Sequence, residues 1–216
     1  MVVHRPGRRA VVATSCGMFV KVVRPRKVAD LVDRYERVAH LATVPRIDLV
    51  DVDLGVVVFH RVPGKTLRRS LLAGDPVPTA SHLDDALAPL WVAGLVHGDL
   101  NDANVLVEDG AVTGVVDLDR SGAGVPDDDR ATLLAHLDAL AIYRPADAAI
   151  VGRYRLRLSD AWGEPPQVRD VRRDLAQRAS DVGRHDESLL LRARNEATPE
   201  GRLGDPSGES LSRRAW

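Results

Sequence analysis

Three polar residues near the middle of the chain have types and spacing suited to phosphoryl chemistry. Asp99 lies five residues before Asn104, and Asp117 follows thirteen residues after Asn104. Mg²⁺ prefers oxygen ligands and usually takes one or two of them from protein, leaving the rest to phosphates and water. One carboxylate and one amide meet that need, and a second carboxylate, free of metal, can accept a proton from an incoming hydroxyl. This combination is typical of phosphoryl transfer from a Mg-bound nucleotide to an alcohol.

The segment between these residues predicts a hairpin that brings two of them together. Two short apolar runs flank the Asp-Gly pair at 109–110, which is the favoured two-residue hairpin turn. In that register Asn104 lies opposite Val115. We therefore expect Asn104 and Asp117 to meet at the open end of the hairpin, with Asp99 on the loop just before it.

The residues before the hairpin indicate a small β-rich region with one helix. Residues 8–23 read as two strands around a Ser-Cys-Gly turn, and the second strand carries Lys21 between two valines. The apolar side chains of residues 28–39 lie on one helical stripe, with Glu36 at its edge. We therefore expect the Glu36 carboxylate to face the element against which this helix packs. Residues 47–59 predict a second hairpin with a glycine in its turn.

The order of elements predicts an α+β chain with two lobes. Pro63 and Gly64 mark the boundary between an antiparallel β N-lobe over 1–62 and a mainly helical C-lobe over 63–195. Residues 196–216 are rich in Gly, Pro and Ser, which indicates a disordered tail. In the C-lobe we expect one helix to begin at Ser81, with Asp84 three positions later completing a capping box, and another to begin at Asp127 to Asp129. Further helices are expected over 145–161 and 166–194.

Composition excludes several classes of partner. The chain has 216 residues, 44% of them apolar, which is enough for a real core. Its net charge of −1 and isoelectric point near 6.7 give no field of one sign for nucleic acid or a membrane surface. A single cysteine, Cys16, allows no disulfide within the chain, and we see neither a signal peptide nor a membrane-spanning run. We expect a cytoplasmic protein.

Three segments resemble a known enzyme family, in the order that the family has them. HGDLNDANVLVEDGAVTGVVDLD resembles the catalytic and metal segments of aminoglycoside phosphotransferases and of the related choline and sugar kinases. FHRVPGKTLRRSL is similar to their hinge, and FVKVVRP to their lysine strand. Together the segments cover residues 10–141. The resemblance implies a two-lobed protein-kinase-like fold and an ATP-dependent, or GTP-dependent, phosphotransferase that acts on a small-molecule hydroxyl.

The resemblance also implies roles for five charged or polar residues. Asp99 would be the catalytic base, and Asn104 and Asp117 would bind Mg²⁺. Lys21 would hold the nucleotide phosphates while paired with Glu36.

Four further residues would support the site. His97 would brace the Asp99 loop, and Asp129, which opens the helix after the metal segment, would have a structural role. The backbone of His60 and Val62 would meet the adenine, because that stretch matches the hinge. Read without the resemblance, Glu36 is equally a solvated helix carboxylate, and Asp33 competes with it as the partner of Lys21.

One departure from the family leaves other functions open. The family has a glycine-containing phosphate loop before its lysine strand, but the twenty residues before Lys21 hold only Gly7 and Gly17. Either the N-lobe is shortened or the true start lies upstream. A nucleotide-binding protein without turnover is therefore an alternative. A metallophosphoesterase is a weaker one, because GDLND matches part of a GDxxD element while the DxH and GNH elements are missing.

The acceptor is the least defined part of the prediction. The C-terminal third mixes arginines and acids almost evenly, so an aminoglycoside, a sugar, an amino alcohol or a natural-product intermediate all fit. The arginine-rich run over 169–194 reads as a solvated helix face. Asp102 and Asp119 read as solvated turn residues more readily than as parts of the site.

Overall fold

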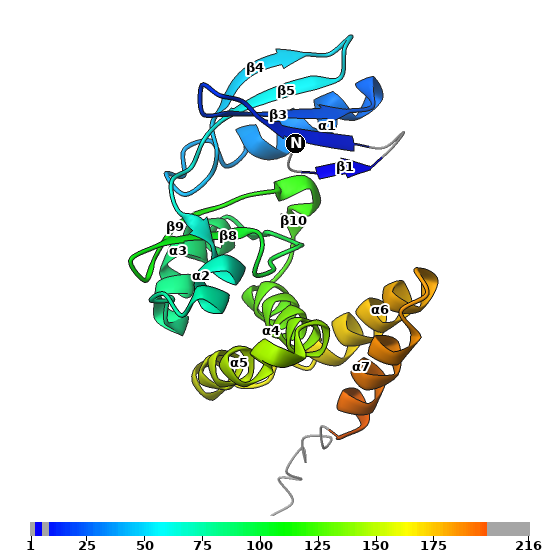
Figure 1. Ribbon diagram of the computed structural model, residues 1–216. Helices are drawn as coiled ribbons and strands as arrows, with labels where there is room; N and C mark the ends of the chain where they lie inside the picture. The colour runs from blue at the N-terminus through cyan, green and yellow to red at the C-terminus, as the bar shows by residue number, and fades with distance from the viewer. Residues whose placement is uncertain (1–2, 6–8, 198–216) are drawn as a thin grey trace, which may run out of the picture.

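The computed structural model describes residues 3–5 and 9–197, and it shows a β-sheet region followed by a mainly helical region (Figure 1). This confirms the predicted α+β, two-lobed fold. The predicted tail at 196–216 lies, except for its first two residues, outside the described residues. Those two residues are the end of a helix, so the helical region extends slightly beyond the expected limit.

The N-terminal sheet is antiparallel and has five strands in the order β1-β2-β3-β5-β4. Both predicted hairpins are confirmed, and a short extra strand precedes them. Gly7 lies outside the described residues. The strands are β1 (Val3–Arg5), β2 (Arg9–Ala13), β3 (Met18–Val23), β4 (Ile47–Asp51) and β5 (Val56–His60).

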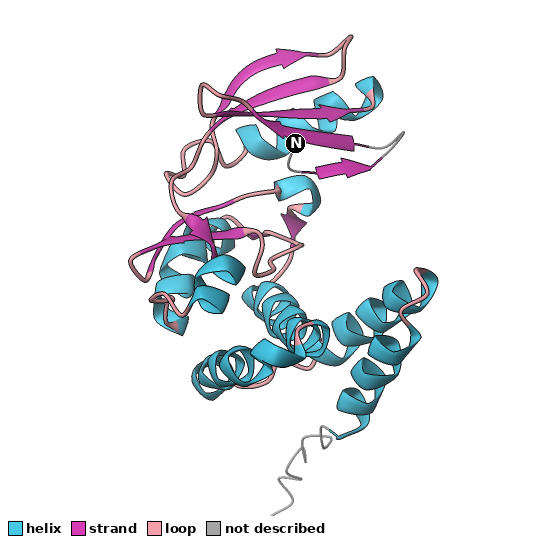
Figure 2. Cartoon of the chain, in the orientation of Figure 1, coloured by secondary structure: helices cyan, strands magenta, loops and turns pink. Residues whose placement is uncertain are grey.

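One face of this sheet is covered by α1 (Val28–Glu36), which follows the short 3-10 helix η1 (Pro25–Lys27) (Figure 2). Alternation along β5 buries Val57 and Phe59 toward this helix, and the ring of Tyr35 meets that of Phe59 with centroids 4.6 Å apart. The apolar stripe of α1 is therefore the inner wall of the N-lobe.

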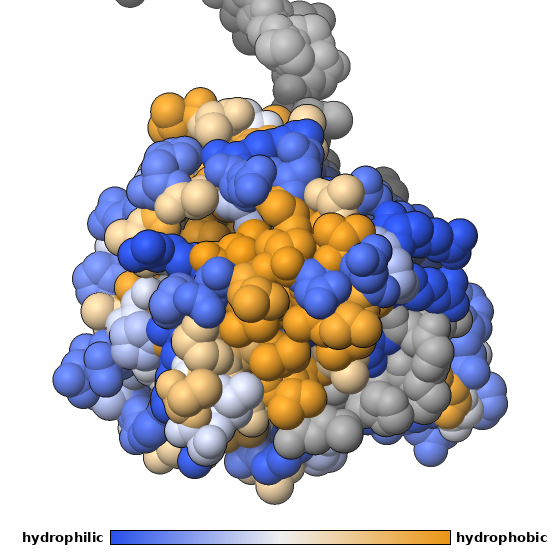
Figure 3. All heavy atoms as spheres, turned by 90° about the horizontal axis from the view of Figure 1, so that it is seen from above, coloured by the Kyte–Doolittle hydropathy of each residue, from blue (hydrophilic) through white to orange (hydrophobic). Residues whose placement is uncertain are grey.

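The opposite face of the sheet is apolar and open (Figure 3). Val12, Val20 and Val58 lie across from one another on neighbouring strands, and Leu49 pairs with Val58 at the edge. Leu49 is about half exposed, at 52%.

The chain enters the helical region through short elements that surround the expected catalytic segment. They are β6 (Lys65–Thr66), α2 (Leu67–Ala73), α3 (Ala80–Val92), β7 (Leu95–Val96), β8 (Val105–Glu108), β9 (Ala111–Val115), η2 (Leu118–Arg120) and β10 (Gly122–Ala123). The predicted cap of α3 at Ser81 is wrong, because the Thr79 hydroxyl accepts the His82 N–H at 3.3 Å and the helix begins one residue earlier.

The hairpin of β8 and β9 has the predicted turn but not the predicted register throughout. Val107 pairs with Val112 as expected, whereas Val105, and not Asn104, pairs with Val115. The shift arises because Thr113 is an extra residue in β9, and its hydroxyl donates to Pro63 O at 2.7 Å.

In the rest of the described chain, three α-helices pack around a central one, α4 (Pro126–Tyr143), whose side chains are buried on several sides. The others are α5 (Ala148–Trp162), which follows η3 (Pro145–Asp147), and α6 (Val168–Asp181) and α7 (His185–Ala197). The single helix predicted over 166–194 is wrong, because the chain breaks at Gly183, whose φ of 79° is left-handed. No helix within residues 3–5 and 9–197 is long and apolar enough to cross a membrane.

The arginine-rich run is not only a solvated face. Arg172 is 2% exposed, and its Nε lies 2.7 Å from Asp138 Oδ2 in the core of the helical region. Arg155 and Arg194 also reach Asp138, at 3.1 and 2.8 Å, and Glu164 contacts Arg172 at 2.8 Å. A buried carboxylate on α4 thus holds α5, α6 and α7 together.

Candidate active site

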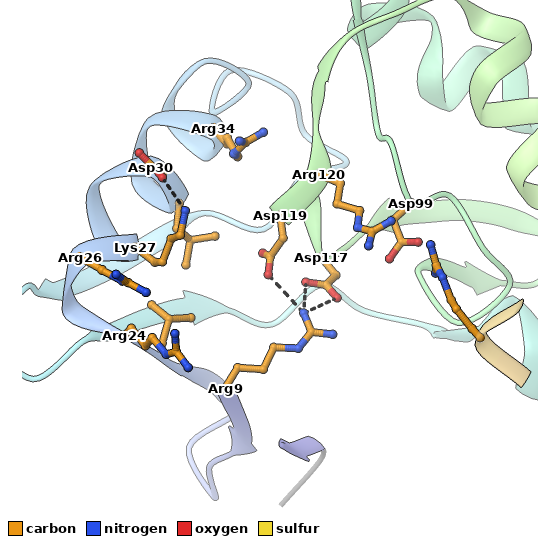
Figure 4. A pocket seen from close by; sticks show the side chains of 13 residues that line it. Arg9, Arg24, Arg26, Lys27, Asp30, Arg34, Asp99, Asp117, Asp119 and Arg120 are labelled. Atoms are coloured by element: carbon orange, nitrogen blue, oxygen red, sulfur yellow. Dashed lines mark hydrogen bonds and ion pairs between the residues drawn. The ribbon is translucent and has the colours of Figure 1, made fainter. Parts of the chain in front are cut away.

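A cavity of about 680 Å³ lies where the sheet region meets the helical region (Figure 4). Asp99 and Asp117, the two carboxylates that the sequence assigns to the chemistry, line it together with Asp119. Its full lining is Arg9, Val23, Arg24, Arg26, Lys27, Asp30, Leu31, Arg34, Asp99, Asp117, Asp119, Arg120 and Arg178.

Two cations from the sheet meet two carboxylates that follow the hairpin. Lys21 Nζ lies 2.7 Å from Asp117 Oδ1 and also contacts Asp119. Arg9 Nη1 lies 3.3 Å from Asp117 Oδ2 and 3.2 Å from Asp119 Oδ2. Burial raises the pKa of Asp117, but the charges of Lys21 and Arg9 outweigh it, and the pKa falls below its ordinary value. Asp117 is therefore held as an anion that faces the sheet.

The partner of Lys21 differs from the expected one. Lys21 is only 5% exposed, because it points from β3 to the face that meets the helical region, and its amine contacts Asp117 and Asp119. Glu36, the last residue of α1, is exposed, outside the stripe that faces the sheet. The expected Lys21–Glu36 ion pair is thus not formed in this structure. Asp33, the competing candidate, is paired with Arg37.

The side chain of Asp129 holds the backbone of the loop that carries Asp99. The Asp129 carboxylate is fully buried and accepts the N–H of His97 at 2.9 Å and of Gly98 at 3.0 Å, as well as the indole N–H of Trp91 at 3.1 Å. Asp129 lies in the first turn of α4, where a carboxylate also interacts favourably with the helix dipole. One side chain therefore fixes two consecutive backbone groups just before Asp99.

His97 holds the same loop from another side. Its ring is buried, with Nε2 2.9 Å from Val116 O and Nδ1 3.3 Å from the Asp99 N–H. Because Nδ1 can only accept that N–H, Nε2 must carry the proton that goes to Val116 O, and the ring is neutral. The ring thereby joins the Asp99 loop to the end of β9.

Asn104 lies between the two segments. Its side-chain N–H donates to Asp99 O at 2.9 Å, and its backbone O accepts the Val116 N–H at 2.9 Å. The amide oxygen is the atom left for another partner. Although the register prediction is wrong by one residue, Asn104 still lies beside the residue that precedes Asp117.

The backbone of the Asp99 loop also lies directly against the backbone of residues 117–121. Gly98 has φ 73°, and a Cβ built on it would lie 2.3 Å from Arg120 O. Only glycine fits this close approach of the two backbones.

Helix α1 contacts residues 117–121 from the N-lobe side. The Tyr35 hydroxyl accepts the Leu118 N–H at 3.2 Å, and Arg34 donates to Ser121 O. Burial raises the pKa of Tyr35, so its hydroxyl stays protonated. Together with Lys21 and Arg9, these contacts bring four side chains of the N-lobe onto residues 117–121.

In the segment predicted to be the hinge, the backbone of His60 is already partly hydrogen-bonded. The His60 N–H donates to Arg46 O at 2.9 Å, so any adenine contact of His60 would come from its carbonyl. Val62 packs on the backbone at Gly114, where a Cβ would lie 2.5 Å from Val62 Cγ1.

Sequence reasoning missed three charged residues of this region. Arg9 carries no signal in the sequence beyond its place on a strand, whereas Asp119 lies two residues after Asp117 and could have been suspected from the Asp-Leu-Asp spacing. Asp102 is not solvated either. It is fully buried and paired with Arg68, with Arg68 Nη2 3.3 Å from Asp102 Oδ1.

The oxygen donors present fit a hard divalent cation. Asp117, Asp119 and the amide oxygen of Asn104 are the ligand types that Mg²⁺ prefers, and the low pKa of Asp117 keeps it in the ligating form. In the part of the chain that the structure describes, no group of three or more His, Cys, Asp and Glu could hold a metal without other ligands.

Comparison with known proteins gives a family and a fold. The sequence model of the family described as "Phosphotransferase enzyme family" matches residues 62–175. No curated protein matches the chain.

Solved structures of similar shape are phosphotransferases. Aminoglycoside phosphotransferase APH(4)-Ia, as a thermostable mutant, has a TM-score of 0.52 at 17% identity, covering 91% of this chain and 92% of that one. Aminoglycoside phosphotransferase APH(3'')-Id from Streptomyces rimosus has a TM-score of 0.48 at 17% identity, covering 85% and 91%. Macrolide 2'-phosphotransferase MphH from Brachybacterium faecium has 0.41 at 16%, covering 91% and 94%. The first likeness supports the fold.

Proposed function

Because this chain belongs to the phosphotransferase enzyme family, we propose that it moves the γ-phosphoryl group of Mg-bound ATP or GTP to a hydroxyl of a small molecule. The observation that carries this proposal is that Asp99 and Asp117 line one cavity, while Lys21, from a third part of the chain, contacts Asp117 at 2.7 Å. Asp117 and Lys21 neutralise each other, whereas the Asp99 carboxylate makes no hydrogen bond or ion pair with any residue in 3–5 or 9–197.

Asp99 acts as the base. Its carboxylate accepts the proton of the acceptor hydroxyl while the hydroxyl oxygen forms a bond to the γ-phosphorus. The bond from the γ-phosphorus to the oxygen bridging the β- and γ-phosphates breaks, and the nucleoside diphosphate leaves. His97 and Asp129 position Asp99, because they fix the backbone on which it stands.

The cations of the sheet bind the nucleotide. Lys21 and Arg9 already share Asp117 and Asp119, so a small movement of their side chains brings their charges to the phosphates. Asn104 and Asp117 would hold Mg²⁺, with Asp119 beside them, and the bound ion would neutralise charge on the β- and γ-phosphates. The carbonyl of His60 and the backbone of Val62 would meet the purine at the hinge, in line with the resemblance.

We predict that Asp99→Asn loses at least a hundredfold in turnover and keeps its affinity for nucleotide, because the amide cannot accept the proton. The measurement is nucleoside diphosphate release with and without candidate acceptors, together with nucleotide binding by calorimetry. Asp109→Asn is the matched control, since Asp109 is an exposed turn residue with φ 49°, which asparagine tolerates.

Full activity of Asp99→Asn would sink the assignment of the base. Nucleotide binding without phosphoryl transfer in the unsubstituted protein, with every acceptor class tested, would favour a binding protein without turnover.

A further inference from the structure

Resting on the proposed function, we propose that the acceptor carries an anionic group, a carboxylate or a phosphate, which Arg120 and Arg178 bind while its hydroxyl faces Asp99. This chemistry is opposite in charge to the polycationic acceptors of aminoglycoside phosphotransferases.

The charge of the cavity is the first observation. Seven of its lining side chains are arginine or lysine and four are aspartate. Of the four aspartates, Asp117 and Asp119 are bound to Lys21 and Arg9, and Asp30 lies 3.3 Å from Lys27. Asp99 is the carboxylate left in the described part of the chain, and it must face the reacting hydroxyl. A polycation would therefore find repulsion and hardly any free carboxylate here.

Arg120 lies directly beside the base. Its backbone oxygen is the atom that forbids a Cβ on Gly98, and the Cβ of Arg120 lies 3.3 Å from the position which that Gly98 Cβ would take. Figure 4 shows the side chain of Arg120 extending next to Asp99, on the opposite side from Arg9, Arg24 and Lys27. Its guanidinium is exposed at the cavity and so can meet a ligand.

Arg178 approaches from the helical region. It lies in the last turn of α6 and lines the same cavity. Asp99 and Arg178 thus line one cavity, and both come from the helical region rather than from the sheet.

A separate set of cations, from the N-lobe, is available to the nucleotide phosphates at the other end of the cavity. Arg9 is on β2, and Arg24, Arg26 and Lys27 precede or form η1, so these four come from the N-lobe near Lys21. Arg120 and Arg178 come from the helical region. Guanidinium groups present paired N–H donors that match the two oxygens of a carboxylate or phosphate, so a pair of arginines beside the base suits an anionic acceptor.

The test uses four three-carbon hydroxyl compounds that differ in charge: glycerate, glycerol 3-phosphate, glycerol and serinol, an amino diol. ADP release from Mg·ATP is measured with each compound for the unsubstituted protein and for Arg120→Gln and Arg178→Gln, and the thermal shift with Mg·ADP is measured for all three proteins. Arg173→Gln is the matched control, because Arg173 is an exposed arginine of the same helix, 2.9 Å from Asp170 and not on the cavity.

We expect kcat/KM at least tenfold higher for one of the two anions than for glycerol, and lowest for serinol. Whether glycerate or glycerol 3-phosphate is preferred distinguishes a carboxylate from a phosphate. Each cavity arginine variant should lose at least tenfold for the anion, mainly through KM, with an unchanged shift in Mg·ADP, while Arg173→Gln behaves like the unsubstituted protein.

Three results would overturn the inference: serinol or glycerol reacting as well as the anions, no anion reacting although Mg·ADP binds, or the two variants losing Mg·ADP binding. The last result would assign both arginines to the nucleotide. Failure of the unsubstituted protein to bind either Mg·ADP or Mg·GDP would instead contradict the proposed function itself.

Discussion

At the scale of single residues, the site depends on charges whose partners lie far away in the sequence. The alternation of β3 predicts that Lys21 and its two valine neighbours lie on opposite faces of the sheet, and the resemblance to the family assigns Lys21 to the nucleotide phosphates. The alternation cannot predict that Asp117 and Asp119, about a hundred residues later, receive the amine. The contact of Arg9 with Asp117 could not be predicted for the same reason, because nothing in the neighbouring sequence distinguishes Arg9 from other strand arginines.

Gly98 offers a test of how closely the two catalytic segments must approach. We predict that Gly98→Ala lowers kcat at least tenfold and lowers the free energy of unfolding by more than 1 kcal/mol, because the new methyl group meets Arg120 O at 2.3 Å and φ is 73°. Activity and urea denaturation measure the two effects.

Gly74→Ala separates the two causes. Gly74 has a similar φ of 75°, but a Cβ there has nothing within 4 Å. It should therefore show the conformational cost alone, about 1 kcal/mol, with kcat unchanged. Equal kcat for the two variants would contradict the packing argument.

At the scale of elements, patterns within one segment were predictable and contacts between segments were not. The stripe of α1 and the Asp-Gly turn each rest on neighbouring residues, so the sequence predicts them well. The bulge at Thr113 depends on Pro63, which lies 50 residues earlier. The capping hydroxyl of Thr79 was missed because Ser81, with Asp84, offers a competing cap signal two residues later.

The buried carboxylate of Asp138 is predicted to hold the helical region together. Asp138→Asn should lower the free energy of unfolding by about 3 kcal/mol or more, because it removes the buried anion shared by Arg172 and Arg155 and leaves only the carboxylate of Glu164 to balance their two charges. Urea denaturation measures this. Asp170→Asn is the control, since its pair with Arg173 is exposed and such pairs contribute about 0 to 1 kcal/mol. Similar losses for the two variants would refute the role of Asp138.

At the scale of the whole molecule, two lobes meet on a short segment. Lys21, Arg9, Tyr35 and Arg34 all reach residues 117–121 from the N-lobe. The two-lobed fold was predictable because the order of strands and helices follows the family's pattern, and the structure confirms it. The lobe limits at 62 and 63 stay a prediction. So does the shortened phosphate loop, because residues 6–8 lie outside the described part of the chain.

The most direct test of the account is the melting temperature of the protein with Mg²⁺ alone, with Mg²⁺ and ATP, and with Mg²⁺ and GTP, alongside Asp117→Ala. A ligand at 100 times its dissociation constant stabilises by about 2.7 kcal/mol, so a bound nucleotide gives a clear upward shift without any known acceptor. The account predicts a shift that requires Mg²⁺ and is lost in Asp117→Ala. No shift with either nucleotide, or an equal shift in the variant, would contradict it.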